Sequence, residues 1–248
     1  MKTFNKDKVI VLVTGFGPYG NTTINPSLAV VKKLQTMSIL TQENSTLPIE
    51  IVSRQVSSEF NKCIKETCAY IDEFHPDAVI MLGEYPGRSM ITIERVAINY
   101  NDSTRYGVKD EAGYAPQGTK VVDDGPAAYF STLPLRRIVT ELRACGIPAD
   151  ISDSAGTLMC NHLMYGALHH VHSTTKARVG KQGVVIPVGW IHLPALPAMA
   201  AKEENLGMPS MTAELSTQAV LTAIQSITKD LQSGNTDVDI PVKSRLLV

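Results

Sequence analysis

The stretch Val9-Ile10-Val11-Leu12-Val13-Thr14 is an unbroken run of apolar and β-branched residues, and it leads directly into Gly15-Phe16-Gly17-Pro18-Tyr19-Gly20. Such a run is typical of a strand that is buried on both faces, because a half-exposed strand would alternate apolar and polar residues. Asn25-Pro26 then supplies a helix N-cap followed by proline at the first helical position. The amino-terminal region therefore predicts a buried strand, a loop and a helix.

The same alternation of strand and amphipathic helix continues along the chain. Further strands are predicted at Ile49 to Val56, Asp77 to Leu82, Met90 to Asn99, Ala149 to Ser152 and Gly183 to Leu193. Apolar residues at three- and four-residue intervals predict helices over Phe60 to Phe74, Leu135 to Cys145, Cys160 to Val171 and Leu215 to Leu231. This order predicts an α/β fold with an open, twisted, mostly parallel sheet and helices on both faces. Ligands of such folds bind near the carboxyl ends of the strands.

Length and composition indicate one globular domain. The 248 residues contain 44% hydrophobic and 19% charged residues, which are ordinary values, and no low-complexity linker or internal repeat divides them. With 23 basic and 24 acidic residues the net charge is -1, so nothing favours a nucleic-acid or anionic-lipid partner. We predict a single α/β domain over residues 1–232. The tail at residues 233–248 has no periodicity and is either disordered or an arm.

The amino-terminal apolar run and the cysteines bear on location. Val9 to Val13 is far too short to span a membrane, and no small-residue cleavage site follows it, so we expect no membrane partner and a cytoplasmic location. The four cysteines fit no zinc-binding spacing, and we expect no metal and no cofactor. In a reducing cytosol all four are expected to be free thiols.

The glycine-rich segment matches the dinucleotide-binding pattern G-x-G-x-x-G, but its context does not. The helix signals come only at Asn25-Pro26, Pro18 stiffens the loop, and Arg54 and Gln55 stand where an acid would close the second strand. We therefore disfavour nucleotide binding. Two interpretations remain for the rings of Phe16 and Tyr19: an aromatic wall at a strand end, or simple packing of a turn.

One cysteine differs from the other three. Cys63, Cys68 and Cys145 fall on apolar helix stripes or helix ends, where cysteine behaves as a small hydrophobe. Cys160 follows the small-residue turn Ser154-Ala155-Gly156-Thr157 and lies at the amino end of a helix. The unpaired N–H groups and the helix dipole there favour a thiolate and can stabilise an oxyanion. The alternative is that Cys160 only begins an apolar stripe.

A thiolate nucleophile needs a base that also protonates the leaving amine, which points to histidine. Of the six histidines, His192 stands alone at the carboxyl end of the predicted strand Val184 to Ile191, where a parallel sheet places its active-site edge. The others lie at a helix end or on the helix that Cys160 opens: His75, His162, His169, His170 and His172. The alternative for His192 is a hydrogen-bonded histidine near the core.

Glu94 lies within a predicted strand. Alternation places Glu94 on one face with Val96 and Ile98, and Arg95 on the other. A carboxylate on an apolar face needs a partner. It could orient a histidine, as the third member of a triad does, or form a structural ion pair with an arginine from elsewhere.

Six segments in chain order carry a resemblance to a known family. They are Thr14 to Gly20, Asn25-Pro26-Ser27, Ile91 to Asn99, Asp124 to Tyr129, Ala155 to His162 and Gly189 to Pro194. In them the chain resembles the cysteine-type pyroglutamyl peptidases, also called pyrrolidone-carboxylate peptidases. The catalytic Glu, Cys and His of that family fall on Glu94, Cys160 and His192. The resemblance implies an open α/β fold, no cofactor, peptides with an amino-terminal pyroglutamate as substrates, and a homotetramer in the cytoplasm.

The resemblance also implies a substrate pocket. The family's substrate ring is a neutral lactam, which suits an apolar slot with a few backbone hydrogen bonds. Phe16 and Tyr19, with Leu158 or Met159, could supply that slot. Tyr19 stands where the family generally has phenylalanine, and Leu158 stands where an aromatic residue is common. We therefore expect looser ring stacking.

The segment Gly83-Glu84-Tyr85-Pro86-Gly87-Arg88 is the largest departure from the family, which usually reads Gly-Gln-Ala-Gly-Gly-Arg there. Glu84 puts a charge beside the expected pocket, where it could change specificity. Arg105, in the polar loop from Asp102 to Pro116, is matched to the family's active-site arginine, or is a solvated surface charge.

These observations predict a cysteine peptidase that removes amino-terminal pyroglutamate through a thioester. His192, oriented by Glu94, would help to generate the Cys160 thiolate, and Arg105 and backbone amides would hold the oxyanion. Three alternatives remain: the same triad acting on another blocked amino-terminal group, a non-catalytic binding protein on this scaffold, and a nucleotide-binding oxidoreductase.

Overall fold

The computed structural model describes residues 7–19, 22–37, 39–40, 47–178, 186–233 and 240–244. The strands are β1 (Val9–Phe16), β2 (Ile39–Leu40), β3 (Ile49–Val56), β4 (Ala78–Glu84), β5 (Ile91–Glu94), β6 (Val96–Ile98), β7 (Asn101–Asp102), β8 (Gln117–Thr119), β9 (Ala128–Phe130), β10 (Ala149–Ser152) and β11 (Val188–Leu193). The α-helices are α1 (Pro26–Gln35), α2 (Phe60–Phe74), α3 (Leu135–Ala144), α4 (Met159–Arg178), α5 (Pro197–Ala200) and α6 (Ala213–Ser233), and the 3-10 helices are η1 (Thr104–Tyr106) and η2 (Glu203–Asn205).

A seven-stranded sheet in the order β10-β5-β11-β4-β1-β3-β2 forms the centre of the molecule. β1 pairs in parallel with β3 and β4, β4 with β11, and β5 with β10, whereas β11 with β5 and β2 with β3 are antiparallel. The run that decides the fold is the interior strand β1, which lies between β4 and β3 and is buried along nearly all of its length. The predicted α/β fold with a mostly parallel sheet is confirmed.

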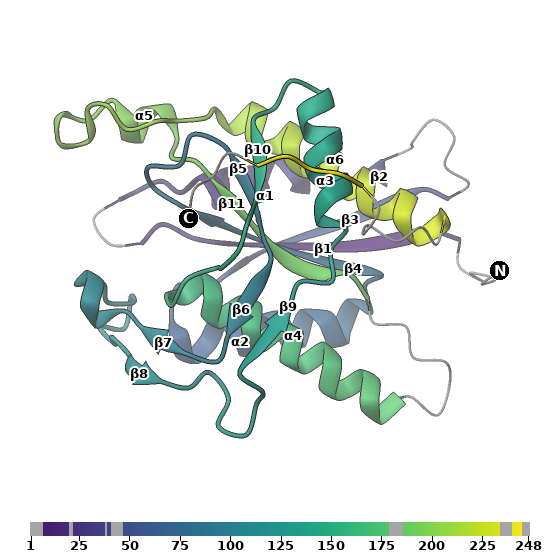
Figure 1. Cartoon of the computed structure of the whole chain (residues 1–248), viewed down its shortest axis with the longest axis horizontal. Helices are drawn as coiled ribbons and strands as arrows, with labels where there is room; N and C mark the ends of the chain where they lie inside the picture. Colours follow the sequence, from purple (N-terminus) through teal and green to yellow (C-terminus); the bar gives the residue numbers. More distant parts are fainter. Residues whose placement is uncertain are drawn as a thin grey trace.

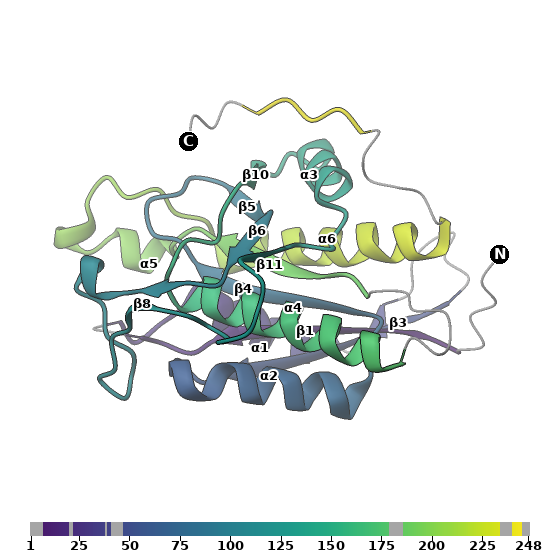
Figure 2. The ribbon, with the colours of Figure 1, turned by 60° about the horizontal axis from the view of Figure 1, so that its bottom comes forward.

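Helices cover both faces of this sheet. The apolar residues of α1, α3 and α6 form one core with the sheet, and those of α2 and α4 form a second core on the opposite face. In Figure 1, α3 and α6 lie above the strands and α2 and α4 below them, and Figure 2 shows the same layers after rotation. Among the described residues, no helix is long and apolar enough to cross a membrane.

One predicted strand is broken. The segment from Met90 to Asn99 divides at Arg95, so that β5 belongs to the main sheet while β6 pairs with β9 in a separate two-stranded sheet. The expectation that Glu94 shares a sheet face with Val96 and Ile98 is therefore wrong. Backbone bonds to other segments hold the break: the Arg95 N–H donates to Ser152 and its carbonyl accepts from Ser131, both at 2.8 Å.

Other boundaries differ only slightly from the prediction. The helix predicted at Leu215 to Leu231 is two residues longer at each end, as α6. The strand predicted from Asp77 runs on to Glu84 as β4. The last strand begins at Val188, and residues 183–185 of its predicted start lie outside the described residues.

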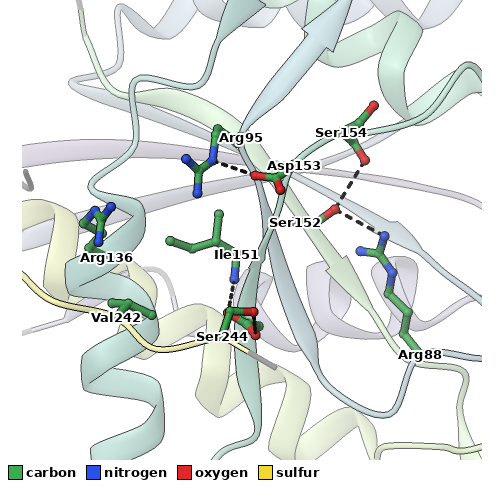
Figure 3. Close-up of a pocket in the computed structure, with 10 residues that line it drawn as sticks. Arg88, Arg95, Arg136, Ile151, Ser152, Asp153, Ser154, Val242 and Ser244 are labelled. Atoms are coloured by element: carbon green, nitrogen blue, oxygen red, sulfur yellow. Dashed lines mark hydrogen bonds and ion pairs between the residues drawn. The ribbon is translucent and has the colours of Figure 1, made fainter. Parts of the chain in front are cut away.

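Part of the carboxyl-terminal tail lies against α3 and β10 (Figures 2 and 3). In the described segment 240–244, the carbonyl of Lys243 accepts a hydrogen bond from Arg143 of α3 at 2.7 Å. Ser244 donates to the buried carboxylate of Asp150 in β10 at 2.6 Å. These contacts place the segment over β10, which is one of the two edge strands of the main sheet. The rest of the tail lies outside the described residues.

Candidate active site

The order of the strands brings Glu94 and His192 together. β11 lies between β4 and β5, and in its register His192 is paired with Gly83 on β4 and with Thr92 on β5. The Nδ1 atom of His192 lies 2.7 Å from Oε1 of Glu94, and both side chains are buried. Glu94 thus has a histidine partner, which is one of the two kinds of partner expected from the sequence.

Arg88 supplies the other partner considered for Glu94. Its Nη1 donates to Glu94 Oε1 at 2.8 Å and also contacts the Thr92 hydroxyl, while Nη2 donates to Ser152 at 3.3 Å. The guanidinium group also lies over the ring of Tyr85, 3.8 Å from its centre. Figure 3 shows Arg88 reaching towards Ser152. Sequence reasoning missed Arg88, although a cation six residues before a carboxylate on an apolar face was a usable signal.

These partners determine the charge of Glu94. Burial by itself raises the pKa of Glu94, but the hydrogen bond and charge of His192, together with Ser152 and Arg88, outweigh burial, and the net pKa is lowered. Glu94 is therefore a carboxylate that accepts the Nδ1 proton of His192. Since one ring nitrogen of neutral imidazole carries the proton, Nε2 is left free to accept one.

Cys160 lies in the first turn of α4, as its sequence context predicted. Its sulfur is close to the backbone of Gly83, because a Cβ atom built on Gly83 would lie 3.1 Å from it and 2.4 Å from the ring of Trp190. A side chain on Gly83 would thus displace the sulfur or the indole. Gly83 is the residue that pairs with His192, so the glycine lets α4 bring the thiol to the histidine's strand.

The electrostatics of Cys160 differ from the sequence expectation. Burial raises the pKa of the Cys160 thiol to about 12 and the carboxyl groups of Glu94 and Glu84 act in the same direction, although its own backbone amide and Arg88 act in the opposite direction. The helix amino terminus was expected to favour the thiolate, and desolvation outweighs it. The raised pKa favours the protonated thiol, so a base must take its proton during reaction.

A cavity of about 350 Å³ opens beside these groups. Eight of the nine predicted site residues either line this cavity or contact a residue that lines it. Seven line its wall: Phe16, Tyr19, Glu84, Leu158, Met159, Cys160 and His192. The eighth, Glu94, contacts His192 from behind. The polar loop from Asp102 to Pro116 also lines the cavity, through five residues that sequence reasoning did not single out: Ser103, Tyr106, Val108, Lys109 and Asp110.

Arg105 is the exception. It does not line the cavity, although its neighbour Tyr106 does. Its side chain is exposed, and the guanidinium group lies over the Tyr106 ring, 4.9 Å from the centre. The structure therefore does not bring Arg105 together with the other site residues.

The glycine-rich segment forms the aromatic wall of this cavity. Its backbone carbonyls are already occupied, because Asn25 donates to Gly17 at 3.0 Å and Ser27 donates to Phe16 at 3.0 Å. The Phe16 ring packs at a tilt on Trp190, with centroids 5.6 Å apart. α1 begins only at Pro26, several residues after the motif. Gly20, the last glycine of the motif, lies outside the described residues.

The other three cysteines have different environments. Cys63 is buried in the core, Cys68 is half-buried and Cys145 is exposed, and all three are free thiols, as Cys160 is. Burial raises the pKa of the Cys63 thiol, and raises that of Cys68 to about 12. Neither lines the cavity.

A second cavity, of about 430 Å³, is lined by Arg88, Ser152 and the tail residues Val242 and Ser244 (Figure 3). Several of its charged side chains have ion-pair partners: Arg88 pairs with Glu94, Arg95 with Asp153 at 3.0 Å, and Asp150 with Arg143 at 3.2 Å. Arg88 thus lines this cavity while holding the Glu94 carboxylate of the first.

Comparison with known proteins gives consistent matches. A family model described as pyroglutamyl peptidase matches residues 9–230. The pyrrolidone-carboxylate peptidase of Mycobacterium tuberculosis is 43% identical over 238 residues, which cover 96% of this chain and 99% of that protein. That of Bacillus cytotoxicus is 40% identical over 202 residues, covering 82% of this chain and 85% of that protein.

Solved structures agree with these sequence matches. The pyrrolidone carboxyl peptidase of Thermococcus litoralis superposes with a TM-score of 0.80 at 33% identity, covering 94% of this chain and all of that one. Pyroglutamyl peptidase I of Bacillus amyloliquefaciens superposes with a TM-score of 0.74 at 35% identity, covering 90% of this chain and 98% of that one.

Proposed function

The chain belongs to the pyroglutamyl peptidase family, cysteine exopeptidases that remove an amino-terminal pyroglutamyl residue, and we propose that Cys160, His192 and Glu94 are its catalytic triad. The observation that carries the proposal is the buried 2.7 Å contact between His192 and Glu94, at the wall of the cavity that Cys160 also lines. A nucleophile, a base and a group that orients the base are the parts that thiol acyl transfer needs.

Acylation begins with the protonated thiol. Nε2 of His192 takes the proton as the Cys160 sulfur bonds to the carbonyl carbon of the pyroglutamyl residue, and the negative charge moves to the carbonyl oxygen. The unpaired N–H groups in the first turn of α4 stabilise this oxyanion. His192 then protonates the leaving amine, the C–N bond breaks, and a thioester remains.

Deacylation uses the same groups in reverse. His192 takes a proton from water as the water oxygen attacks the thioester carbon. The C–S bond then breaks, the sulfur recovers the proton from His192, and pyroglutamate leaves. Through both steps the Glu94 carboxylate holds the Nδ1 proton and stabilises the imidazolium that forms.

The cavity wall suits the substrate ring. Phe16, Tyr19, Leu158 and Met159 offer rings and apolar side chains to a neutral lactam, and we assign them to substrate binding. Arg105 is exposed and outside the wall, so the oxyanion role rests on the backbone amides rather than on Arg105.

We further propose, from the family resemblance, that the enzyme works as a homotetramer in the cytoplasm. The four free cysteines fit a reducing compartment. Sedimentation velocity of the purified chain tests the assembly, and a monomer at micromolar concentration would contradict it.

The decisive test of the triad is the nucleophile. Purified full chain should release fluorophore from a pyroglutamyl amide, and Cys160→Ser should reduce kcat by at least ~10³-fold, because serine is a far weaker nucleophile in a site that does not activate it. Cys145→Ser, which alters an exposed thiol at the end of α3, is the matched control and should keep wild-type activity. Equal rates for Cys160→Ser and the wild type would refute the mechanism.

A further inference from the structure

Glu84 places a carboxyl group in the wall of the active-site cavity. It ends β4, one residue after the Gly83 that pairs with His192, and its side chain is 7% exposed. Oε2 accepts a hydrogen bond from the Tyr19 hydroxyl at 3.1 Å. Oε1 is buried and has no hydrogen-bond partner among the described residues. A buried polar atom without a partner, in the wall of a binding cavity, indicates that a ligand supplies the partner.

No cation within the described part of the chain forms an ion pair with Glu84, whereas the nearby Arg88 is paired with Glu94. Burying a carboxylate without a cation is costly. The neutral carboxyl avoids this cost and gains a function, because it presents an O–H donor beside a C=O acceptor on a single edge.

The pyroglutamyl ring presents the complementary edge. A five-membered lactam forces its amide to be cis, so that its N–H and C=O point to the same side, whereas the amides of an ordinary peptide chain are trans and point to opposite sides. Oε2 has one lone pair for Tyr19 and a second for the lactam N–H. A proton on Oε1 then donates to the lactam carbonyl, which closes a pair of hydrogen bonds.

We propose that the neutral side chain of Glu84 recognises the cis-amide edge of the pyroglutamyl ring and thereby makes substrate affinity depend on pH. The inference rests on the proposed function, because it assigns a role in binding that function's substrate. It gives the cavity a means of distinguishing a lactam from an open-chain amide, which its apolar wall alone lacks.

The surroundings of Glu84 are consistent with this state. Burial raises the pKa of Glu84, and the hydrogen bond from Tyr19 opposes the rise only in part. The other titratable groups around it are Tyr19, whose pKa is raised by burial and by Glu84, and the protonated thiol of Cys160. His192 lies on the next strand, and Lys109 and Asp110 line the same cavity. A bound ring would displace water and favour the neutral form further.

The sign of the pH effect follows. Below the pKa of Glu84 the O–H donor is present and the ring binds. As pH rises through that pKa the donor is lost, and a carboxylate oxygen faces the lactam carbonyl oxygen, which repels it. Affinity therefore falls with rising pH, and the loss appears in KM more than in kcat.

The test compares KM across the range from mildly acidic to mildly alkaline pH, with a fluorogenic pyroglutamyl amide and the full-length enzyme. Glu84→Gln keeps a donor and an acceptor on one edge but does not ionise. We expect it to match the wild type at acidic pH within about twofold and to have an about tenfold lower KM at alkaline pH. Glu84→Met, of similar size without hydrogen bonds, should raise KM about tenfold at acidic pH. Circular dichroism melts establish that both variants fold.

Because both variants retain the triad, the pH dependence of His192 and Cys160 cancels in the comparison. The inference is overturned if KM of the wild type and of Glu84→Gln has the same pH dependence, or if Glu84→Met binds as well as the wild type at acidic pH. If the enzyme still hydrolyses the pyroglutamyl amide, either of those results overturns the role of Glu84 but not the proposed function.

A binding measurement tests the role of Glu84 independently of whether the protein hydrolyses a peptide. Calorimetric titration with pyrrolidin-2-one needs no turnover, and we compare the Cys160→Ser protein with the double variant Cys160→Ser, Glu84→Gln. Lactam binding that weakens with rising pH in the single variant, and does not in the double variant, supports the Glu84 role even if no peptide is hydrolysed. Equal and pH-independent binding by both proteins overturns it.

Discussion

β4 and β5 lie on either side of β11 and each ends in a buried glutamate, so that Glu84 and Glu94 flank the strand of His192. Their partners differ. Glu94 contacts Arg88 and His192, and these interactions lower its pKa in spite of burial. Among the described residues, the Glu84 side chain has only the Tyr19 hydroxyl as a hydrogen-bond partner, and burial raises its pKa. Two buried carboxyl groups that flank one strand therefore have pKa values shifted in opposite directions.

The difference shows that the polar partners of each carboxyl group, and not its burial alone, set the direction of its pKa shift. Both are almost inaccessible to water, so desolvation alone would keep both neutral. His192, Ser152 and Arg88 all favour the carboxylate of Glu94, whereas within the described ranges of the chain Glu84 has only the Tyr19 hydroxyl to oppose its burial. Pairs of carboxyl groups whose surroundings separate their pKa values are typical of enzymes that use them for different tasks.

The two groups also act on folding stability in opposite directions. Because the pKa of Glu94 is lowered in the folded state, its contribution is present above its unfolded pKa and is lost as pH falls through the folded value. Because the pKa of Glu84 is raised, its contribution is present at low pH and is lost as pH rises.

The strongest way to break the comparison is to remove the charge of Glu94. Glu94→Gln should lower kcat by ~10³–10⁴-fold, because an amide no longer holds the Nδ1 proton and no longer stabilises the imidazolium. Steady-state hydrolysis of a pyroglutamyl amide measures the effect. Glu141→Gln is the matched control, since Glu141 forms a surface pair with Lys229 on the α3 and α6 side, and should keep wild-type kcat. A decrease below tenfold would show that Glu94 does not orient His192.

A smaller effect is expected from removing Arg88, the cation that pairs with Glu94 and not with Glu84. Arg88 lowers the pKa of Glu94, so in Arg88→Met that pKa should rise and Glu94 should be protonated at higher pH. The acid limb of the kcat profile should move to higher pH, with a loss on the order of tenfold at neutral pH.

Arg88→Lys separates charge from packing in this experiment. It retains a cation but not the fork that reaches both Glu94 and Ser152, and should restore part of the shift in the acid limb. If Arg88→Met lowers the rate without moving the acid limb, then Arg88 supports the loop only and does not act on Glu94.

Local sequence patterns were sufficient to select the residues that meet at this site. A solitary histidine at a strand end, a cysteine at a helix start and a carboxylate on an apolar strand each needed a partner. The parallel pairing of β4 and β11 brings their carboxyl ends together. β5 runs antiparallel to β11, so Glu94 meets His192 across this strand pair and not at a shared carboxyl edge. The structure places His192, Cys160 and Glu94 at one cavity. Their roles remain predictions until the variants are measured.

What the sequence could not predict depends on tertiary contacts. The alternation of residues continues through Arg95, so nothing local indicates that β6 leaves the sheet to pair with the distant β9. Arg88 precedes Glu94 in a loop whose path is set by packing rather than by propensity. The raised pKa of Cys160 arises from desolvation and from two carboxyl groups on other strands, which no local pattern contains.

The smallest predicted effect sharpens the comparison on the Glu84 side. The Tyr19 hydroxyl donates to Glu84 and so lowers the pKa of that carboxyl group, in opposition to burial. In Tyr19→Phe the pKa of Glu84 should rise further, and the increase of KM should begin at higher pH, with KM about two- to threefold below the wild type at alkaline pH. The measurement is the pH dependence of KM, with Tyr70→Phe on α2 as the control.

Because the effect acts through ionisation of Glu84, it should vanish when Tyr19→Phe is combined with Glu84→Gln. Persistence in the double variant, or a shift to lower pH, would place the role of Tyr19 in ring packing and not in the charge of Glu84.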